Sequence, residues 1–303
     1  MLTSDTIPVN GIATHALRGG KSGGAAALFL HGGSSGATPF ASGVHVWGPV
    51  LEAFSAERPV TAIDLPGSGR TPALGEVLTI DALGKHVAAL IDATGAGPCH
   101  VVGHDEGGLA ALWLALHAPA KLKSITVVAS RTAAPTGDGL PVLTLNSPPQ
   151  PLWGRISQAW VLEQISYSYA HVTDAFLDTC VAAAEGEPHR ALVKRRTSDA
   201  AARTAFAESA ARLRTQLFKL YREVGAPCPV QLVWASHDPL TSLDRGFGMY
   251  EIIAKKQPIT RFDVINRAGN LPFREEPQAF HDVVAAFQAG VDEYRRAPAQ
   301  RVA

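Results

Sequence analysis

The sequence predicts an α/β fold in which a mostly parallel sheet is covered by helices on both faces. Short apolar runs alternate with segments of helical periodicity along most of the chain. These runs are apolar throughout, which is typical of strands buried on both faces. The composition agrees, because 46% of the 303 residues are hydrophobic and only 18% are charged. Such a chain can bury a large core.

The predicted elements follow in order along the chain. Residues 9–18 can form an antiparallel hairpin in front of the sheet. Buried strands are expected at 25–30, 59–65, 99–103, 124–129, 230–235 and 260–265. Helices are expected at 80–94, 107–117 and 279–294, and the end at 295–303 is expected to fray.

One segment interrupts this alternation. Residues 131–226 begin with a stretch rich in Pro, Gly and Thr and continue with helical patterns at 174–184 and 200–224. We interpret 131–226 as a helical insertion, and 1–130 with 227–303 as the core that contains the sheet.

Composition also limits the classes of partner. Lys plus Arg and Asp plus Glu each number 27, so no basic excess predicts nucleic-acid binding. No apolar run is long enough for a membrane span, and the first residues lack the layout of a signal peptide. Cys99, Cys180 and Cys228 lie far apart and are expected to be buried thiols. We expect a cytoplasmic protein with a small-molecule substrate, and the sequence leaves the oligomeric state open.

The most informative local sequence is GHDEGG at 103–108, which follows a predicted strand and opens a predicted helix. A Gly-x-nucleophile-x-Gly pattern suits a sharp, strained turn that exposes its central side chain. The flanking glycines let strand and helix pass closely. Asp105 occupies the central position. The structural alternative is an Asp that only caps the helix.

Further motifs follow the other strands: HGGSSG at 31–36, DLPGSGR at 64–70, WASHDPL at 234–240, AGNLPF at 268–273 and EEP at 275–277. Together these motifs resemble those of the α/β-hydrolase superfamily. They look most like its meta-cleavage-product hydrolase and epoxide hydrolase branches. The resemblance implies an eight-stranded sheet and a helical cap at about 131–226.

The resemblance also implies roles for individual residues: a nucleophile, a triad acid and an oxyanion hole. These roles fall in turn on Asp105, on Asp238, and on Gly32, Gly33 and Ser34 with the backbone N–H of Glu106. Asn270 stands where the family has its histidine base. The second departure is an Asp nucleophile among motifs that suggest relatives with serine.

Asp105 and Asn270 together restrict the chemistry. An ionised Asp can attack an sp³ carbon, as in the epoxide hydrolases and haloalkane dehalogenases that this elbow resembles. Water must then release the ester, and a neutral Asn cannot take up the proton. Glu106 is a candidate base, because neighbouring carboxylates push their pKa values apart. Its alternative is a solvated or salt-bridged residue of the first helical turn. A carboxylate there would repel a leaving halide, which argues against dehalogenation.

Candidate substrate-binding residues come from the first loop and from the insertion: His31, Trp153, Tyr167, Tyr169 and His171. The last three would share one side of an extended segment, whereas on a helix they would diverge. For His31 the alternative is bracing of the oxyanion loop, for Trp153 a place in the core or pocket wall, and for the other three packing or a surface position. His104 is expected to pack behind the sheet.

Three interpretations of function remain open. The first is a hydrolase of an epoxide, ester or C–C bond in a small apolar or aromatic substrate that contains oxygen. The second is a lyase, cyclase or isomerase in which Asp105 is a general acid or base and Asn270 holds a substrate oxygen. The third is an inactive ligand-binding relative, or a variant substituted at Asp105 or Asn270 so that it traps its substrate. No metal cluster, phosphate loop or dinucleotide fingerprint is apparent, so no metal or cofactor is expected.

Overall fold

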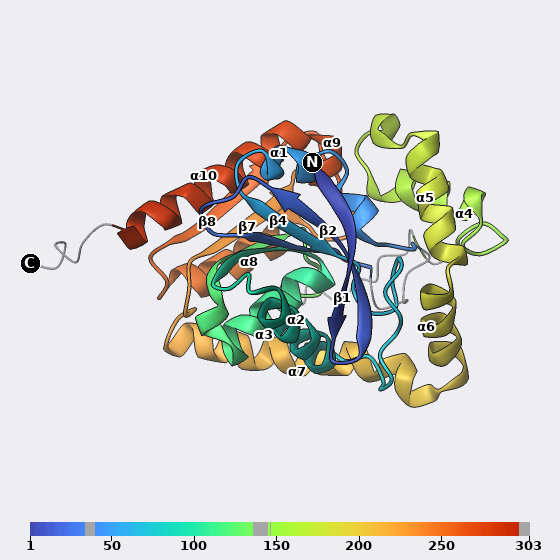
Figure 1. Cartoon of the computed structure of the whole chain (residues 1–303), viewed down its shortest axis with the longest axis horizontal. Helices are drawn as coiled ribbons and strands as arrows, with labels where there is room; N and C mark the ends of the chain where they lie inside the picture. The colour runs from blue at the N-terminus through green and yellow to red at the C-terminus, as the bar shows by residue number, and fades with distance from the viewer. Residues whose placement is uncertain (34–39, 136–144, 146, 297–303) are drawn as a thin grey trace, which may run out of the picture.

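An eight-stranded sheet forms the centre of the computed structural model, which describes residues 1–33, 40–135, 145 and 147–296 (Figure 1). The strand order is β1-β2-β4-β3-β5-β6-β7-β8. Strand β2 is antiparallel to both β1 and β4, and all other neighbours are parallel. The predicted mostly parallel sheet is confirmed.

The strands agree with the apolar runs except at the N-terminus. They span β1 Leu2–Val9, β2 Ile12–Gly20, β3 Ala27–Leu30, β4 Pro59–Ile63, β5 Cys99–His104, β6 Leu122–Val128, β7 Val230–Ala235 and β8 Thr260–Ile265. The hairpin of β1 and β2 turns at residues 10–11, so the range 9–18 was too short. Most side chains of β1 are exposed on this edge strand, and no apolar run marked it.

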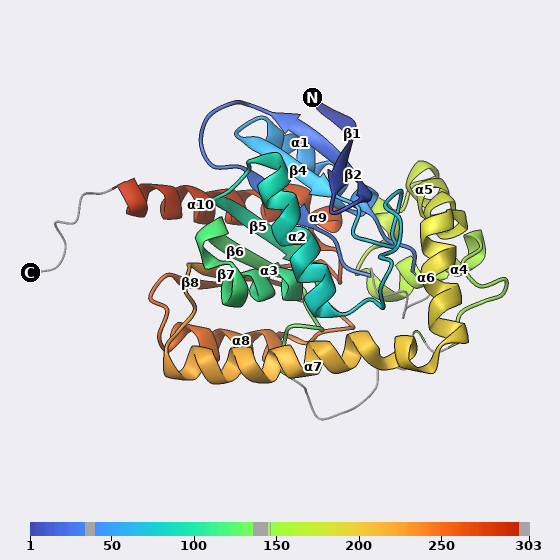
Figure 2. The same ribbon diagram turned by 60° about the horizontal axis from the view of Figure 1, so that its bottom comes forward.

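Helices cover both faces of the sheet. Helices α1 (Val50–Ser55) and α10 (Pro277–Arg296) pack on one face, and α2 (Ile80–Thr94), α3 (Glu106–His117) and α8 (Leu243–Ala254) pack on the other (Figures 1 and 2). A hydrophobic cluster fills the space on each side. The three cysteines are buried and unbonded to one another, as expected.

The segment between β6 and β7 is largely helical. It contains α4 (Arg155–Ile165), the 3₁₀ turn η4 (Tyr169–His171), α5 (Asp174–Glu185), α6 (Glu187–Ser198) and α7 (Ala200–Glu223). Helices α4, α5 and α6 lie together at one end of the molecule, whereas α7 packs along α2, α3 and α8 (Figure 2). Within the described ranges, no helix is both long and apolar enough to cross a membrane.

The carboxyl ends of the parallel strands, β3 to β8, meet at one edge of the sheet. This edge carries the segments that follow each of these strands. In open α/β sheets it is the usual position of a ligand site. Two short helices lie between strands in the chain, η1 (Val44–Trp47) and η2 (Pro119–Lys121), and a third, α9 (Pro272–Glu275), follows β8. Of these, η1 and α9 contact each other.

Candidate active site

Asp105 lies on a strained turn between β5 and α3. Its backbone has φ +41° and ψ −108°, a conformation that non-glycine residues rarely adopt. A Cβ on Gly103 would come within 2.3 Å of the Gly107 carbonyl oxygen. A Cβ on Gly107 would lie 2.2 Å from the Leu30 carbonyl oxygen. The sequence therefore forms this turn because glycine occupies both crowded positions.

Thr132 binds the Asp105 carboxylate. The backbone N–H of Thr132 donates to Asp105 Oδ1 at 2.9 Å, and its hydroxyl donates to the same oxygen. Ser130 Oγ donates to the Asp105 carbonyl at 2.7 Å. Asp105 Oδ2 accepts no hydrogen bond from the part of the chain that the structure describes. One carboxylate oxygen is thus fixed and the other is available to a ligand.

Asp238 and Asn270 form a hydrogen-bonded pair at the ends of β7 and β8. Asn270 Nδ2 donates to both carboxylate oxygens of Asp238, at 3.1 and 3.3 Å. The backbone N–H groups of Leu240 and Thr241 also donate to Asp238 Oδ1. Burial raises the pKa of Asp238 to about 7, although these hydrogen bonds act in the opposite direction. Asn270 and Asp238, which follow different strands, thus lie side by side.

His104 lies on the cavity side of the elbow, so the prediction that it packs behind the sheet is wrong. Its Nε2–H donates to the backbone carbonyl of Asn270 at 3.0 Å and to Asn270 Oδ1 at 3.2 Å. The second ring nitrogen, Nδ1, is buried and has no partner within the described residues. A Cβ on Gly32 would lie 2.8 Å from both this nitrogen and Asp105 Cβ, so His104 and Asp105 converge behind Gly32. Burial lowers the pKa of His104, so the ring is neutral.

The backbone N–H of Gly33, in the loop after β3, was expected to serve the oxyanion hole, but its partner is a carboxyl group. The backbone N–H of Gly33 donates to Glu106 Oε2. Glu106 is 4% exposed, so the solvated alternative for this side chain is wrong. Its own N–H is one of the four at the start of α3 that lack a partner within the helix. Ser34 lies outside the described residues.

A cavity of about 40 Å³ lies next to Asp105, His104 and Asn270. Its lining comes from the loop after β3, the elbow, the insertion and the loops after β7 and β8. The residues are Gly32, Gly33, Phe40, Ser42, His104, Asp105, Leu145, Val161, Ile165, Leu240, Asn270 and Leu271. His104 therefore faces this cavity and does not pack behind the sheet. The sequence feature that could have indicated this position is that His104 directly precedes Asp105.

The five candidate substrate-binding side chains are absent from this described lining. Tyr167 and Tyr169 are 48% and 45% exposed. Residues 169–171 form a 3₁₀ turn, so the extended arrangement does not occur. His171 Nε2 instead pairs with Ser166 Oγ at 2.8 Å.

The other two candidates have structural contacts. His31 is fully buried, accepts a hydrogen bond from the Leu65 N–H at 2.9 Å and donates to the Gly32 carbonyl at 2.8 Å. It thus braces the loop after β3. Trp153 packs near Ala41 and contacts the ring of His189 edge-on. Since neither side chain lines the cavity, binding at these five residues is not supported by the geometry.

Glu275 is a positioning residue that sequence reasoning missed. Its carboxylate accepts hydrogen bonds from the backbone N–H groups of Tyr167, Ser168 and Gly269. The N–H of Asn270 donates to the Ile165 carbonyl at 2.7 Å. These bonds join the loop that carries Asn270 to the segment after α4. Glu275 follows the AGNLPF motif closely, but the motif did not indicate which backbone groups it binds.

Comparison with known proteins gives the family. The model of the alpha/beta hydrolase family matches residues 27–283. A pimeloyl-[acyl-carrier protein] methyl ester esterase from Aeromonas hydrophila is 27% identical over 275 residues, which cover 86% of this chain and 94% of that protein. A "Putative carbamate hydrolase RutD" from Variovorax paradoxus is 39% identical over 104 residues. That match covers 34% of this chain and 37% of the relative's length.

Solved structures agree on the fold. A meta-cleavage product hydrolase from Pseudomonas fluorescens superimposes with a TM-score of 0.75 at 19% identity, covering 94% of this chain and 97% of that one. A lipase-like protein from Acinetobacter baumannii gives a TM-score of 0.75 at 18% identity, covering 97% and 93%. The eight-stranded sheet, the motifs and the family match together lead to one conclusion: this chain belongs to the alpha/beta hydrolase family.

Proposed function

We propose that the chain is a cofactor-independent enzyme in which Asp105 performs general acid–base chemistry on a small, largely apolar substrate that contains oxygen. The reaction class is elimination, isomerisation or cyclisation, and not hydrolysis through an acyl-enzyme. The observation that carries this proposal is the hydrogen bond from Gly33 N–H to the Glu106 carboxylate.

Acyl transfer needs a site for a developing oxyanion. Backbone N–H groups supply it, and losing one donor costs about 10²–10³ in rate. At Gly33 the Glu106 carboxyl group already accepts the hydrogen bond from the N–H, so this donor is not available to an oxyanion. Proton transfer by Asp105 needs no such site. The Glu106 carboxylate therefore favours acid–base chemistry over ester or C–C hydrolysis.

The groups behind Asp105 support the same chemistry. Asp238 binds Asn270, and Asn270 fixes the tautomer of His104 through the hydrogen bonds to His104 Nε2. The lone pair of His104 Nδ1 then faces toward Gly32 and Asp105. In the proposed reaction the Asp105 carboxylate takes a proton from one atom of the substrate and returns it to another, and the neutral His104 ring lies beside it. Asn270, which lines the cavity, holds the substrate oxygen.

The test rebuilds a serine triad with and without the Glu106 carboxylate. Asp105→Ser with Asn270→His should remain a poor esterase toward p-nitrophenyl butyrate. Adding Glu106→Met frees the Gly33 N–H, and kcat/KM should then rise by about 10²-fold or more. Adding Glu185→Met, which removes an exposed glutamate, is the matched control. Full esterase activity without Glu106→Met would contradict the proposal.

A second candidate is hydrolysis through an ester on Asp105, which is favoured because Asp105 Oδ2 accepts no hydrogen bond from the described residues. Styrene oxide in ¹⁸O-water separates the two candidates when product, substrate and intact protein are followed by mass spectrometry. A mass adduct on the protein that Asp105→Ala abolishes, or label in the Asp105 carboxylate after turnover, would support the second candidate. The first predicts neither, and Asp105→Asn should then abolish conversion of any substrate found.

A further inference from the structure

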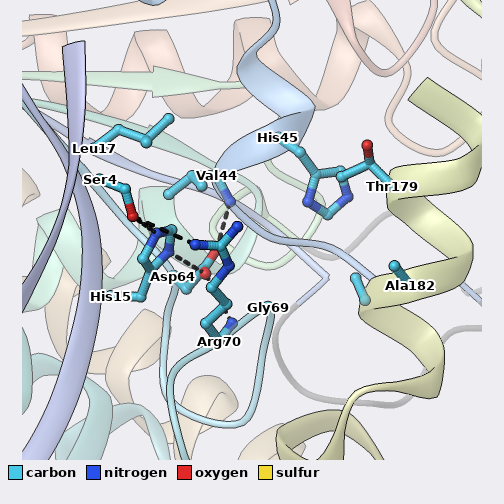
Figure 3. A pocket seen from close by; sticks show the side chains of 11 residues that line it. Ser4, His15, Leu17, Val44, His45, Asp64, Gly69, Arg70, Thr179 and Ala182 are labelled. Carbon is cyan, nitrogen blue, oxygen red and sulfur yellow. Dashed lines mark hydrogen bonds and ion pairs between the residues drawn. The ribbon is translucent and has the colours of Figure 1, made fainter. Parts of the chain in front are cut away.

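A second and larger cavity lies between the core and helix α5. Its volume is about 320 Å³, within the range of small-molecule sites. Figure 3 shows its walls, which come from the β1–β2 hairpin, the loop after β4, η1 and α5. The lining comprises Ser4, His15, Leu17, Val44, His45, Asp64, Gly69, Arg70, Thr179, Ala182 and Ala183. None of these residues lines the Asp105 cavity.

Asp64 organises the polar wall of this cavity. It accepts hydrogen bonds from the backbone N–H groups of Val44 at 2.7 Å and Arg70 at 2.9 Å, and from His15 Nδ1 at 2.7 Å. Burial alone would raise the pKa of Asp64, but His15 and the backbone donors hold it below its usual value. Asp64 is therefore ionised and its bonding capacity is largely used. It supplies fixed negative charge next to the cavity.

Arg70 supplies a cation with unused donors. Among the residues that the structure describes, its guanidinium makes one long hydrogen bond, from Nη1 to Ser4 Oγ at 3.4 Å. Across the described ranges it forms no ion pair with a carboxylate. In Figure 3 its side chain lies beside Ser4, His15 and Asp64, on the side of the cavity opposite α5. A guanidinium with free N–H groups is a good partner for a carboxylate.

The remaining wall is mainly apolar. Leu17 and Val44 come from the core, and Ala182 and Ala183 come from α5. His45 also lines the cavity, and its buried Nε2 has no hydrogen-bond partner among the described residues. Burial lowers the pKa of His45 to about 4, so the ring is neutral and adds no charge. The cavity thus combines a cation with unused donors, a neutral polar group and an apolar surface.

We propose that this cavity is a second binding site, for a small monocarboxylate with an apolar body. The carboxylate pairs with Arg70, and the apolar body packs between Leu17, Val44 and α5. A single negative charge fits because Asp64 is close, and a dianion would meet stronger repulsion from it. A ligand here contacts both the sheet side and α5, so it would hold α5 against the core without entering the Asp105 cavity.

Isothermal titration calorimetry with benzoate tests the site, with benzyl alcohol as the neutral comparison. Benzoate should bind the full chain and benzyl alcohol should not. Arg70→Gln should weaken benzoate binding by about tenfold or more, since a charged hydrogen bond is lost. Lys21→Gln removes an exposed cation that does not line the cavity, and it should leave the affinity unchanged.

A second pair of variants tests the position. Ala182→Phe fills the cavity from an exposed place on α5 and should abolish binding, whereas Ala175→Phe on the same helix should not. Asp105→Asn should bind benzoate like the parent chain. The proposal is overturned by absent benzoate binding, by binding that survives both Arg70→Gln and Ala182→Phe, or by binding that Asp105→Asn abolishes. Tighter binding of phenyl phosphate than of benzoate would also overturn it. None of these results depends on the reaction proposed for Asp105.

Discussion

Asp238 illustrates how one buried carboxyl group affects the whole protein through its protonation. Its pKa is raised to about 7, mainly by burial, whereas an unfolded Asp has its usual pKa near 3.8. Between these values the folded state binds the proton and the unfolded state does not. The free energy of unfolding contributed by Asp238 is therefore fully present below about pH 4 and is lost as pH rises to about 7.

Asp238→Asn should remove this pH dependence. The variant keeps the shape of the side chain but cannot ionise, so it should gain about 2–4 kcal/mol relative to the parent between about pH 4 and about pH 7. Urea unfolding of both proteins across this range measures the difference. Asp282→Asn, at an exposed carboxylate, should show no such trend. A flat difference for Asp238→Asn would mean that Asp238 is ionised in the folded protein throughout.

Single residues also show how far the sequence could predict the site. Asp105, Asp238 and Asn270 could be placed because each follows a strand whose carboxyl end lies at the same edge. The contacts of His104 and Glu106 could not be predicted. Both depend on which way a side chain turns once Gly32 and Gly33 lie against the elbow, and no spacing along the chain records that direction.

In the strand–turn–helix element around Asp105, the backbone at the start of α3 lies directly against β3, so a side chain at Gly107 has no room. Gly107→Ala would place a Cβ 2.2 Å from the Leu30 carbonyl oxygen, which belongs to a buried strand and cannot move away. We expect a loss of about 3 kcal/mol or more in the free energy of unfolding. Thermal or urea unfolding measures it.

Gly290→Ala is the matched control within a helix. Apart from the backbone of its own helix and its chain neighbours, no atom of the described residues lies within 4 Å of an added Cβ at Gly290 in α10. The substitution should stabilise the protein by about 0.5–1 kcal/mol, because it removes glycine's extra freedom in the unfolded chain. Equal effects of the two substitutions would show that the close approach of α3 to β3 is not the cause.

Strands whose residues are all buried could be predicted from the sequence, whereas strands with a mixture of buried and exposed residues were harder to predict. Strands β5 and β7 are buried at every residue and appear in the sequence as short apolar runs. Strand β1 has a mixed pattern because it lies at the edge, and only its pairing with β2 identifies it. The turn η4 was ambiguous because alternate aromatic residues suit both an extended segment and a short helix.

At the scale of the whole molecule, several histidines are buried without charge. Burial lowers the pKa to about 4 for His45, His86, His100, His171 and His189. The unfolded chain protonates them near 6.5. Their contribution to stability is therefore fully present above about pH 6.5 and is lost as pH falls toward about 4. Since five groups act in this direction, they outweigh the opposite effect of Asp238.

The free energy of unfolding should fall by several kcal/mol, on the order of 5, between about pH 7 and about pH 4.5. Urea unfolding at the two values measures the change. His86→Gln should reduce it, whereas His117→Gln, at an exposed residue, should not. If the parent is equally stable at both values, these histidines are not neutral in the folded protein.

The length of helix α7 determines how the chain returns from the insertion to the sheet. Its 24 residues correspond to about 36 Å, enough to run from the carboxyl edge of the sheet back to the opposite edge, where β7 begins. It makes this return while packed on α2, α3 and α8. The connection needed to continue the sheet is thus complete without α4, α5 and α6. Replacement of those three helices would leave the path of the chain through the sheet intact, but it would remove Val161 and Ile165 from the wall of the Asp105 cavity.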